Sequence, residues 1–414
     1  MPRDVLDSDP GLSRNPPPAR MSSTDPASSA APLPLDGIRV LDLTRVLAGP
    51  YCTMLLADLG AEVVKIERPD GGDDARGFGP FLPSGESAYF ASVNRGKRSL
   101  TLNLKDPADR NCLLRLIDKA DVLVENFRPG TMEGLQLGSA ELRARNPRLV
   151  FASVTGFGRT GPDSRRPAYD VIVQALSGLM SITGHDSAEP ARVGTSISDI
   201  VAGVFTALAV VAALRRRDVT GIGGDVDISM LECTVATLEN ALARFAVTKQ
   251  APGPLGTRHP SIAPFQGFHA ADGMLVIAAG NDVLWRKLCQ VLDAPELIAD
   301  PRLATNRDRS ANNDAVEQEL NVRLQHKPVA EWLKQFDAAG VPAAPIRRID
   351  EVLADPHLHE REMWHTVSAQ ADERLVTAGT PFVFDAAKPQ LSPRWPVLGE
   401  DGKAVLRDWL GDES

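Results

Sequence analysis

The sequence has no excess of basic residues, no cysteine pattern and no long apolar run at its N-terminus. Its 414 residues hold 54 acidic and 45 basic side chains, for a formal net charge of −9. Nucleic-acid recognition needs a basic face, so this balance argues against a nucleic-acid partner. The four cysteines are far apart and show no CxxC or Cys/His spacing, so neither a zinc site nor a disulfide framework is indicated and a cytoplasmic location fits best. They are Cys52, Cys112, Cys233 and Cys289.

Motifs and segments of several common protein classes are also missing. No GxGxxG follows the first predicted strand, and no GxxxxGK[ST] occurs, which argues against nicotinamide enzymes and enzymes of nucleoside triphosphates. No apolar run reaches the length that we expect of a transmembrane helix, and the N-terminus lacks the apolar core of a secretory signal. We therefore expect no membrane partner.

What the sequence does contain is a pattern of alternating strands and helices. A hydrophobic fraction of 43% supports a real core, and the length suits about two domains. Residues 1–34 are rich in Pro, Ser, Ala and Asp, which predicts a disordered tail. From Leu35, short β-rich runs alternate with amphipathic segments, which predicts βαβ units in a mostly parallel sheet. The predicted strands are Ile38–Thr44, Glu62–Arg68, Ser99–Leu104, Val122–Asn126 and Leu149–Phe157. Further along the chain we predict a long helix at Leu231–Lys249, a loop at Leu255–Phe268 and a short strand at Pro381–Phe384.

Cationic residues follow several of these strands. Ligands of parallel sheets bind beyond the carboxyl ends of the strands, where Arg and Lys can neutralise phosphate groups. In an acidic protein, such a grouping favours a small polyanionic ligand, although each charge taken alone is equally typical of a solvated loop. The cations are Arg45, Arg68, Arg76, Arg95, Lys97, Arg98, Lys105 and Arg128.

The most apolar stretch of the chain begins just after Asp199. From Ile200 to Leu214 the only polar residue besides a glycine is Thr206, which predicts a helix buried in the core. A carboxylate at the start of this helix would accept hydrogen bonds from its free amides and lie at the positive end of its dipole. Asp199 is therefore either an ordinary N-cap or a carboxylate held in place for a ligand.

Several motifs together resemble the family III CoA-transferases. They are LDGIRVLDLTRVLAGPYCTMLLADLGAEVVKIERP from Leu35, SVNRGKRSLTLNLK from Ser92, VLVENFRPG from Val122 and SVTGFGRTGP from Ser153. The resemblance covers the chain from Leu35 to its end. It implies a large Rossmann-like α/β domain built from residues 35–230 and 350–414, a smaller α/β domain at 255–349, and an interlocked homodimer.

The resemblance also implies coenzyme A as the polyanion, acting as a substrate with no permanently bound cofactor and no metal. Asp199 matches the family's nucleophile, and Asp170 matches a second carboxylate beside it. Where formyl-CoA transferases carry an arginine after ENFRPG, this chain has Gly134, so one phosphate contact is either lost or supplied by Arg128. The implied CoA contacts are Val46, Arg68, Leu102, Asn103, Leu104, Lys105, Asn126, Phe127 and Arg128.

The activity implied is transfer of CoA from an acyl-CoA, such as succinyl-CoA, to a small carboxylic acid. An α-methylacyl-CoA racemase is one alternative, but those enzymes place a His before the second carboxylate, where this chain has Tyr169. A CoA-binding protein without turnover is the other alternative. Formyl-CoA transferases that act on oxalate carry a Gln at the position of Leu47, so this chain is expected to prefer longer dicarboxylic acids. The candidate contacts of the acid are Leu47, Tyr169, Arg258 and His259, and Arg258 with His259 are the candidate partners of its far carboxylate.

Overall fold

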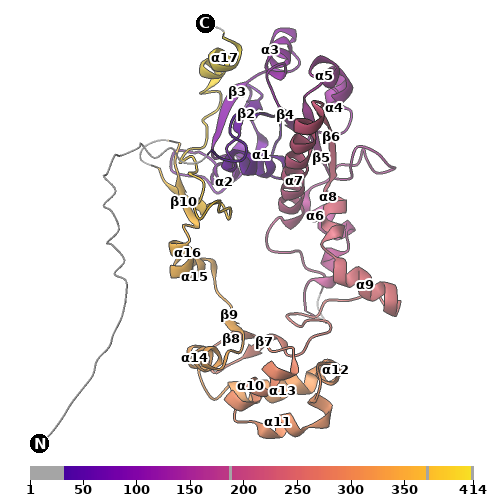
Figure 1. Cartoon of the computed structure of the whole chain (residues 1–414), viewed down its shortest axis with the longest axis vertical. Helices are drawn as coiled ribbons and strands as arrows, with labels where there is room; N and C mark the ends of the chain where they lie inside the picture. The colour runs from indigo at the N-terminus through magenta and orange to yellow at the C-terminus, as the bar shows by residue number, and fades with distance from the viewer. Residues whose placement is uncertain (1–31, 186–188, 370–372, 412–414) are drawn as a thin grey trace, which may run out of the picture.

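A six-stranded parallel sheet is the main feature of the computed structural model, which describes residues 32–185, 189–369 and 373–411 (Figure 1). The strand order is β3-β2-β1-β4-β5-β6, so the chain starts in the middle and reverses direction between β1 and β4. This confirms the predicted Rossmann-like sheet, while the predicted tail lies almost entirely outside the described residues. The strands are β1 (Arg39–Asp42), β2 (Glu62–Glu67), β3 (Lys97–Thr101), β4 (Val122–Glu125), β5 (Val150–Thr155) and β6 (Gly224–Ser229).

Helices cover both faces of this sheet because successive strand residues point to opposite faces. Val40, Val63 and Val122 pack with α1 (Ala48–Asp58) and α7 (Ile197–Thr220), whereas Leu41, Val64 and Leu123 pack on the other side. The helices of that second side are α3 (Pro107–Ile117), α4 (Thr131–Gly134), α5 (Ser139–Arg145) and α17 (Gly402–Leu410).

The C-terminal segment lies beside the start of the chain. Trp409 of α17 is buried against the second side of the sheet, and its indole N–H donates to Glu62 Oε1 of β2 at 2.8 Å. Asp408 forms an ion pair with Arg98 of β3 at 2.9 Å. Segments more than 300 residues apart in sequence therefore share one core. The elements on the way to α17 are α15 (Ile349–Leu353), α16 (Pro356–Glu360), β10 (Trp364–Val367) and β11 (Leu375–Ala378).

A second, antiparallel sheet with its own core lies at the other end of the molecule in Figure 1. It consists of β7 (Phe265–His269), β8 (Met274–Ala278) and β9 (Ala343–Pro345), and buried Trp285, Phe336 and Leu320 belong to its core. The predicted domain boundaries at 230, 255 and 350 stay a prediction. The helices of this unit are α10 (Asp282–Val291), α11 (Pro295–Ala299), α12 (Asn306–Ala311), α13 (Asn313–Leu324) and α14 (Val329–Ala339).

Three local predictions are wrong. The expected long helix Leu231–Lys249 is two helices, α8 (Met230–Ala236) and α9 (Glu239–Thr248). The expected strand Pro381–Phe384 is absent from the described residues, and the partner of β10 is β11 instead. The segment expected to be a loop at 255–268 ends in β7. The remaining short elements are α2 (Ala88–Val93) and α6 (Asp170–Leu176), with 3-10 turns at Asp74–Gly77, Leu179–Ile182 and Pro301–Leu303.

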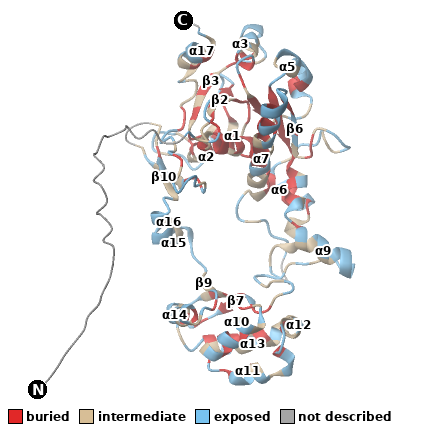
Figure 2. Ribbon diagram, viewed as in Figure 1, coloured by how far each residue is buried: buried red, intermediate tan, exposed pale blue. Residues whose placement is uncertain are grey.

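Helix α7 is longer than its apolar run, with 24 residues. By length and composition alone it would be long enough to cross a membrane, so the expectation that no segment reaches that length is wrong. Such a match is weak evidence for a membrane segment, because one side of α7 packs against α1 and the parallel sheet. Gly203 allows that packing: a Cβ there would lie 2.7 Å from the backbone oxygen of Ala48 in α1. The other side of α7 is exposed (Figure 2). The predicted cytoplasmic location stays a prediction.

Candidate active site

The loop between β1 and α1 is held in an unusual backbone conformation. Val46 has a φ of +68°, which is a true outlier for a β-branched residue. Three polar contacts hold it: Asn126 Oδ1 accepts from the Arg45 N–H at 2.8 Å, Asn126 Nδ2 donates to the Arg45 carbonyl at 2.7 Å, and Asp73 accepts from the Val46 N–H at 3.0 Å. Such strain persists only where the surroundings determine it, and it is concentrated at ligand sites.

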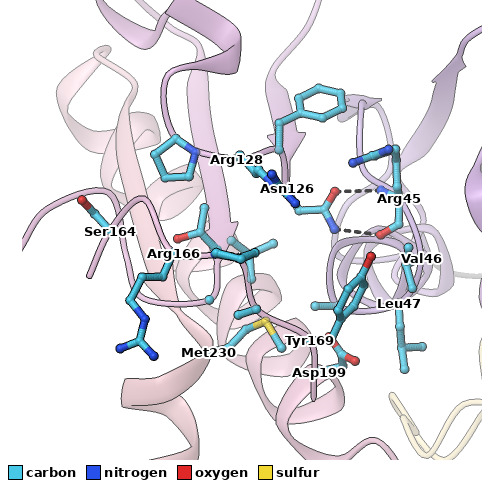
Figure 3. Close-up of a pocket in the computed structure, with 18 of the residues that line it drawn as sticks. Arg45, Val46, Leu47, Asn126, Arg128, Ser164, Arg166, Tyr169, Asp199 and Met230 are labelled. Atoms are coloured by element: carbon cyan, nitrogen blue, oxygen red, sulfur yellow. Dashed lines mark hydrogen bonds between the residues drawn. The ribbon is translucent and has the colours of Figure 1, made fainter. Parts of the chain in front are cut away.

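Two neighbouring pockets follow the carboxyl edge of the sheet on either side of this loop. The first contains Asp199 and the second lies beyond β2 and β3, and both are lined by Arg45 and Phe127. The guanidinium of Arg45 lies over the ring of Phe127, 5.5 Å from its centroid. Of the implied CoA contacts, Val46, Asn126, Phe127 and Arg128 line the first pocket (Figure 3). Arg68, Leu102, Asn103, Leu104, Lys105 and again Phe127 line the second.

The two candidate carboxylates meet at the start of α7. Asp199 is the third residue of this helix, one turn inside the N-cap position of Ser196, so it is not the N-cap itself. Asp170 begins α6 but supports α7, because its Oδ1 accepts a hydrogen bond from the Ser198 N–H at 2.9 Å. Its Oδ2 accepts from Gln174 at 2.7 Å. The two carboxylates therefore share one helix N-terminus, where the helix dipole favours negative charge.

Burial and the nearby charge of Asp170 raise the pKa of Asp199 to about 7. Both effects disfavour the ionised carboxylate. A strongly shifted pKa in a pocket marks a candidate for chemistry. Asp199 is thus poised between its neutral and ionised forms near neutral pH.

Tyr89 is a residue of this region that the sequence did not point to. Burial raises the pKa of its phenol to about 12, and the negative charges of Asp199, Asp73 and Asp170 add to the shift. The phenol, which comes from α2, therefore lies within electrostatic reach of both candidate carboxylates. Its sequence distance from Asp199 hides this proximity, and no motif signals it.

Half of the cations expected at the strand ends pair with carboxylates of the fold and line neither of the two pockets. Arg95 is buried with Asp58 at 2.6 Å, and Lys97 is buried with Asp42 at 3.0 Å. Arg76 pairs with Glu67 at 2.8 Å. Arg98 likewise bridges two carboxylates of the fold. The other four, Arg45, Arg68, Lys105 and Arg128, line the two pockets.

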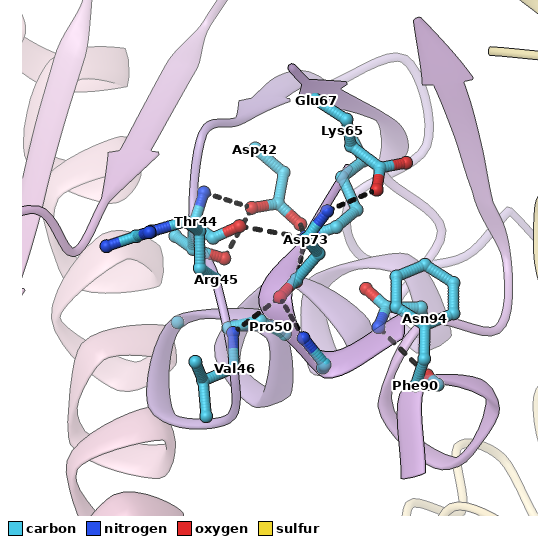
Figure 4. A network of polar contacts seen from close by, with 12 residues as sticks. Asp42, Thr44, Arg45, Val46, Pro50, Lys65, Glu67, Asp73, Phe90 and Asn94 are labelled. Carbon is cyan, nitrogen blue, oxygen red and sulfur yellow. Dashed lines mark hydrogen bonds and ion pairs between the residues drawn. The ribbon is translucent and has the colours of Figure 1, made fainter. Parts of the chain in front are cut away.

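A buried ionic network lies beside the strained loop (Figure 4). Lys65 of β2 has a fully buried side chain that pairs with Asp73 at 2.9 Å and lies 3.9 Å from Asp42. It also donates to the Thr44 carbonyl at 2.8 Å. Since Asp73 accepts a hydrogen bond from the Val46 N–H, the network connects strand β2 to the loop that lines both pockets.

The four candidate contacts to the acid fall into two groups. Leu47 and Tyr169 line the pocket of Asp199. Arg258 and His259 line a different pocket, beside α9, and Arg258 forms ion pairs with Asp314 at 2.7 Å and Glu317 at 2.5 Å. The cations that do line the pocket of Asp199, among the described residues, are Arg45, Arg128 and Arg166. No group of three His, Cys, Asp or Glu residues within the described ranges is placed to hold a metal ion.

Comparison with known proteins adds the family. The profile of CoA-transferase family III matches residues 35–402. Acetyl-CoA:oxalate CoA-transferase of Acetobacter aceti is 44% identical over 95% of this chain and 100% of its own length. Succinyl-CoA:glutarate CoA-transferase of Mus musculus is 40% identical over 91% of this chain and 86% of its own. A crystal structure of a CAIB/BAIF family protein from Brucella suis superposes with a TM-score of 0.81 at 37% identity, covering 92% of this chain and all of that chain.

Proposed function

This chain belongs to CoA-transferase family III, and on that premise we propose that it moves coenzyme A from succinyl-CoA or a similar acyl-CoA to a dicarboxylic acid. The observation that supports this function best is that the two pockets are neighbours that share lining residues. One holds a carboxylate with a raised pKa, and the other offers cations and apolar walls, with Arg45 and Phe127 common to both. A long ligand with a reactive thioester at one end and phosphates at the other suits such a pair.

Asp199 is the proposed nucleophile. Its carboxylate attacks the thioester carbonyl of the acyl-CoA, so that a mixed anhydride forms and CoA leaves as a thiolate. The thiolate then attacks the aspartyl carbonyl of the anhydride, which releases the acid and leaves CoA bound to Asp199 as a thioester. The acceptor acid repeats both steps in reverse order: its carboxylate displaces CoA to form a second anhydride, and the thiolate then takes the acceptor's acyl group and frees Asp199.

The position of Tyr169 argues against the racemase alternative. Proton removal and return next to a thioester need a positioned base, and a phenol is a poorer base than the imidazole of a histidine. Tyr169 is 67% exposed at the pocket rim, where the racemases would have a histidine. A CoA-binding protein without turnover would have no use for a nucleophile-type carboxylate in the same pocket.

The choice of acceptor acid tests this proposed function. A panel of oxalate, malonate, succinate, glutarate and butyrate, offered with succinyl-CoA, should show transfer to dicarboxylic acids well above transfer to butyrate. The apolar side chain of Leu47 in the pocket wall favours acids longer than oxalate. Oxalate belongs in the panel because one relative is named for it. A preference for butyrate would refute the dicarboxylate assignment while leaving CoA transfer intact.

Two arginine variants, assayed with that panel, separate the candidate partners of the far carboxylate. Arg166 lines the pocket of Asp199, is half exposed and has one partly exposed partner, Asp163 at 2.9 Å. Arg258 is instead paired with two carboxylates in another pocket. We therefore expect Arg166→Met to lose about tenfold more rate with glutarate than with butyrate, and Arg258→Ala to affect both acids equally. If Arg258→Ala instead loses more rate with glutarate than with butyrate, the loop that carries Arg258 would have to reach the active site of a neighbouring chain.

We also propose that two copies of the chain form a homodimer. Large apolar side chains are exposed along α6, α7 and α9, and a second copy would bury them. Leu208→Glu, at 62% exposed, should lower the mass found by light scattering from two chains to one. Val322→Glu, at 59% exposed on α13, is the matched control and should leave the mass unchanged. A wild-type protein with the mass of one chain would refute the homodimer. The exposed residues are Val171, Ile172, Leu176, Val204, Phe205, Leu208, Leu242, Phe245 and Val247.

A further inference from the structure

Asp74 bridges two arginines that flank the paired pockets. Its Oδ2 lies 2.8 Å from Arg45 Nη1, and its Oδ1 lies 2.8 Å from Arg68 Nη2. The bridge is open to solvent, since the three side chains are 33%, 42% and 55% exposed in the order Asp74, Arg45 and Arg68. Arg45 lines both pockets, Arg68 lines the second, and Asp74 lines the first. A carboxylate thus lies between two cations at the junction where the proposed CoA path changes pockets.

The position of Arg45 does not depend on this carboxylate alone. Its backbone is held from both sides by Asn126, and its guanidinium lies over Phe127. Solvent-exposed ion pairs contribute little stability, because water screens the charges and two side chains lose freedom. A phosphate group offers more acceptor oxygens and more charge than a carboxylate, and guanidinium groups bind it through paired hydrogen bonds. A phosphate that reached the two arginines would therefore displace Asp74 readily.

We propose that Asp74 is an internal competitor of the CoA phosphates. It holds Arg45 and Arg68 together while the site is empty, a phosphate of the acyl-CoA takes its place, and the carboxylate returns when CoA leaves. The inference rests on the proposed function. It gives Asp74 a positioning role that suits a CoA-transferase. The substrate and the product both carry the CoA group, so binding CoA too tightly would slow release of the product.

The test compares Asp74→Asn with Asp70→Asn. Asp70 is exposed and carries the same charge in the same loop, so the pair controls for net charge. Calorimetric titration with CoA at two salt concentrations should show that Asp74→Asn lowers the Kd about three- to tenfold and makes binding more sensitive to salt. Asp70→Asn should change the Kd less than about twofold. Inhibition by pantetheine, which has no phosphate, should be the same in all three proteins.

Slower release of CoA from Asp74→Asn in stopped-flow displacement would complete the expected result. Weaker or unchanged CoA binding in Asp74→Asn, with the same outcome in Asp74→Ala, would overturn the inference. An equal gain in pantetheine affinity would also overturn it, because phosphate would then not be the group that competes. Wild-type protein that binds CoA and forms the Asp199 thioester keeps the proposed function in all of these cases. Wild-type protein that does not bind CoA would instead refute the proposed function itself.

Discussion

Replacing Asp199 with alanine is expected to lower the rate of CoA transfer by at least about 10⁴-fold. In the proposed reaction this carboxylate carries every covalent intermediate, and Asp74, the other carboxylate that lines the pocket, is paired with Arg45 and Arg68 instead. Binding of CoA itself should change little, since Arg68 and Lys105, two of the proposed CoA contacts, line the neighbouring pocket and Asp199 does not. The measurements are steady-state transfer from succinyl-CoA and calorimetric titration with CoA. Asp199→Asn is a weaker variant, because slow deamidation would restore the carboxylate.

A matched control for this variant lies in the same helix. Asp218 is exposed in the last turn of α7, and Asp218→Ala should keep ordinary turnover. Wild-type protein incubated with acyl-CoA and then hydroxylamine should carry a hydroxamate on the peptide that contains Asp199 and on no other. Ordinary turnover by Asp199→Ala, or a label on a different peptide, would contradict the assignment.

The pH dependence of thioester formation offers a second measurement of the same group. Only the ionised carboxylate attacks, and the pKa of Asp199 is raised to about 7 by burial and by Asp170. Single-turnover rates should therefore fall about tenfold for each pH unit below about 7. Asp170→Asn removes the like charge and keeps an oxygen for the Ser198 N–H, so its inflection should move to lower pH. An unchanged inflection in this variant would mean that burial alone sets the pKa.

The sequence predicts the sheet because short clusters of apolar, often β-branched residues recur in its strands, as in VLVE of β4 and VFASVT of β5. A strand that is buried on both faces carries apolar residues on both, so its own sequence is enough to predict it. Each observed strand of the parallel sheet from β1 to β5 overlaps a predicted one. Helix α7 was recognisable for the same reason. The strands of the small unit are harder to predict from the sequence. Strand β7 pairs with β8, but it follows a Pro-rich segment and both of its end residues are exposed, so its sequence resembles that of a loop.

The site was predictable where one motif carries several contacts and not where the fold joins distant segments. Asp199 and the proposed CoA contacts lie in motifs that resemble a known family. Tyr89 and the Asp74 bridge depend on tertiary placement, and nothing in their local sequence separates them from ordinary surface residues. The cations after the strands show most clearly what the sequence cannot predict. Lys97 and Lys105 look alike in the sequence, but Lys97 is buried against Asp42 whereas Lys105 lines a pocket.

Replacing Lys65 with methionine is expected to destabilise the protein by about 3–5 kcal/mol at pH 7. The side chain is fully buried, and its ammonium pairs with Asp73 and lies near Asp42. Burial would lower the pKa of Lys65, but the charges of Asp42, Asp73 and Glu67 outweigh it and raise the pKa, so the ammonium stays charged. Methionine keeps most of the volume but leaves Asp73 as a buried anion without its cation. Lys119→Met, exposed after α3, is the control and should change stability by less than about 0.5 kcal/mol.

The pH dependence of this loss separates the ionic role of Lys65 from its packing. Burial alone would raise the pKa of Asp73, but Lys65 and backbone hydrogen bonds lower it below its usual value. A carboxylate of this kind contributes stability above its unfolded pKa of about 3.9, and the contribution is lost as the pH falls towards the folded value. The difference between wild type and Lys65→Met should therefore be greatest near neutral pH and shrink below about pH 4. Urea unfolding at several pH values measures it, and a difference that does not vary with pH would mean that methionine fails through packing alone. Because Asp73 also accepts from the Val46 N–H, folded Lys65→Met should in addition bind CoA more weakly than the Lys119→Met control.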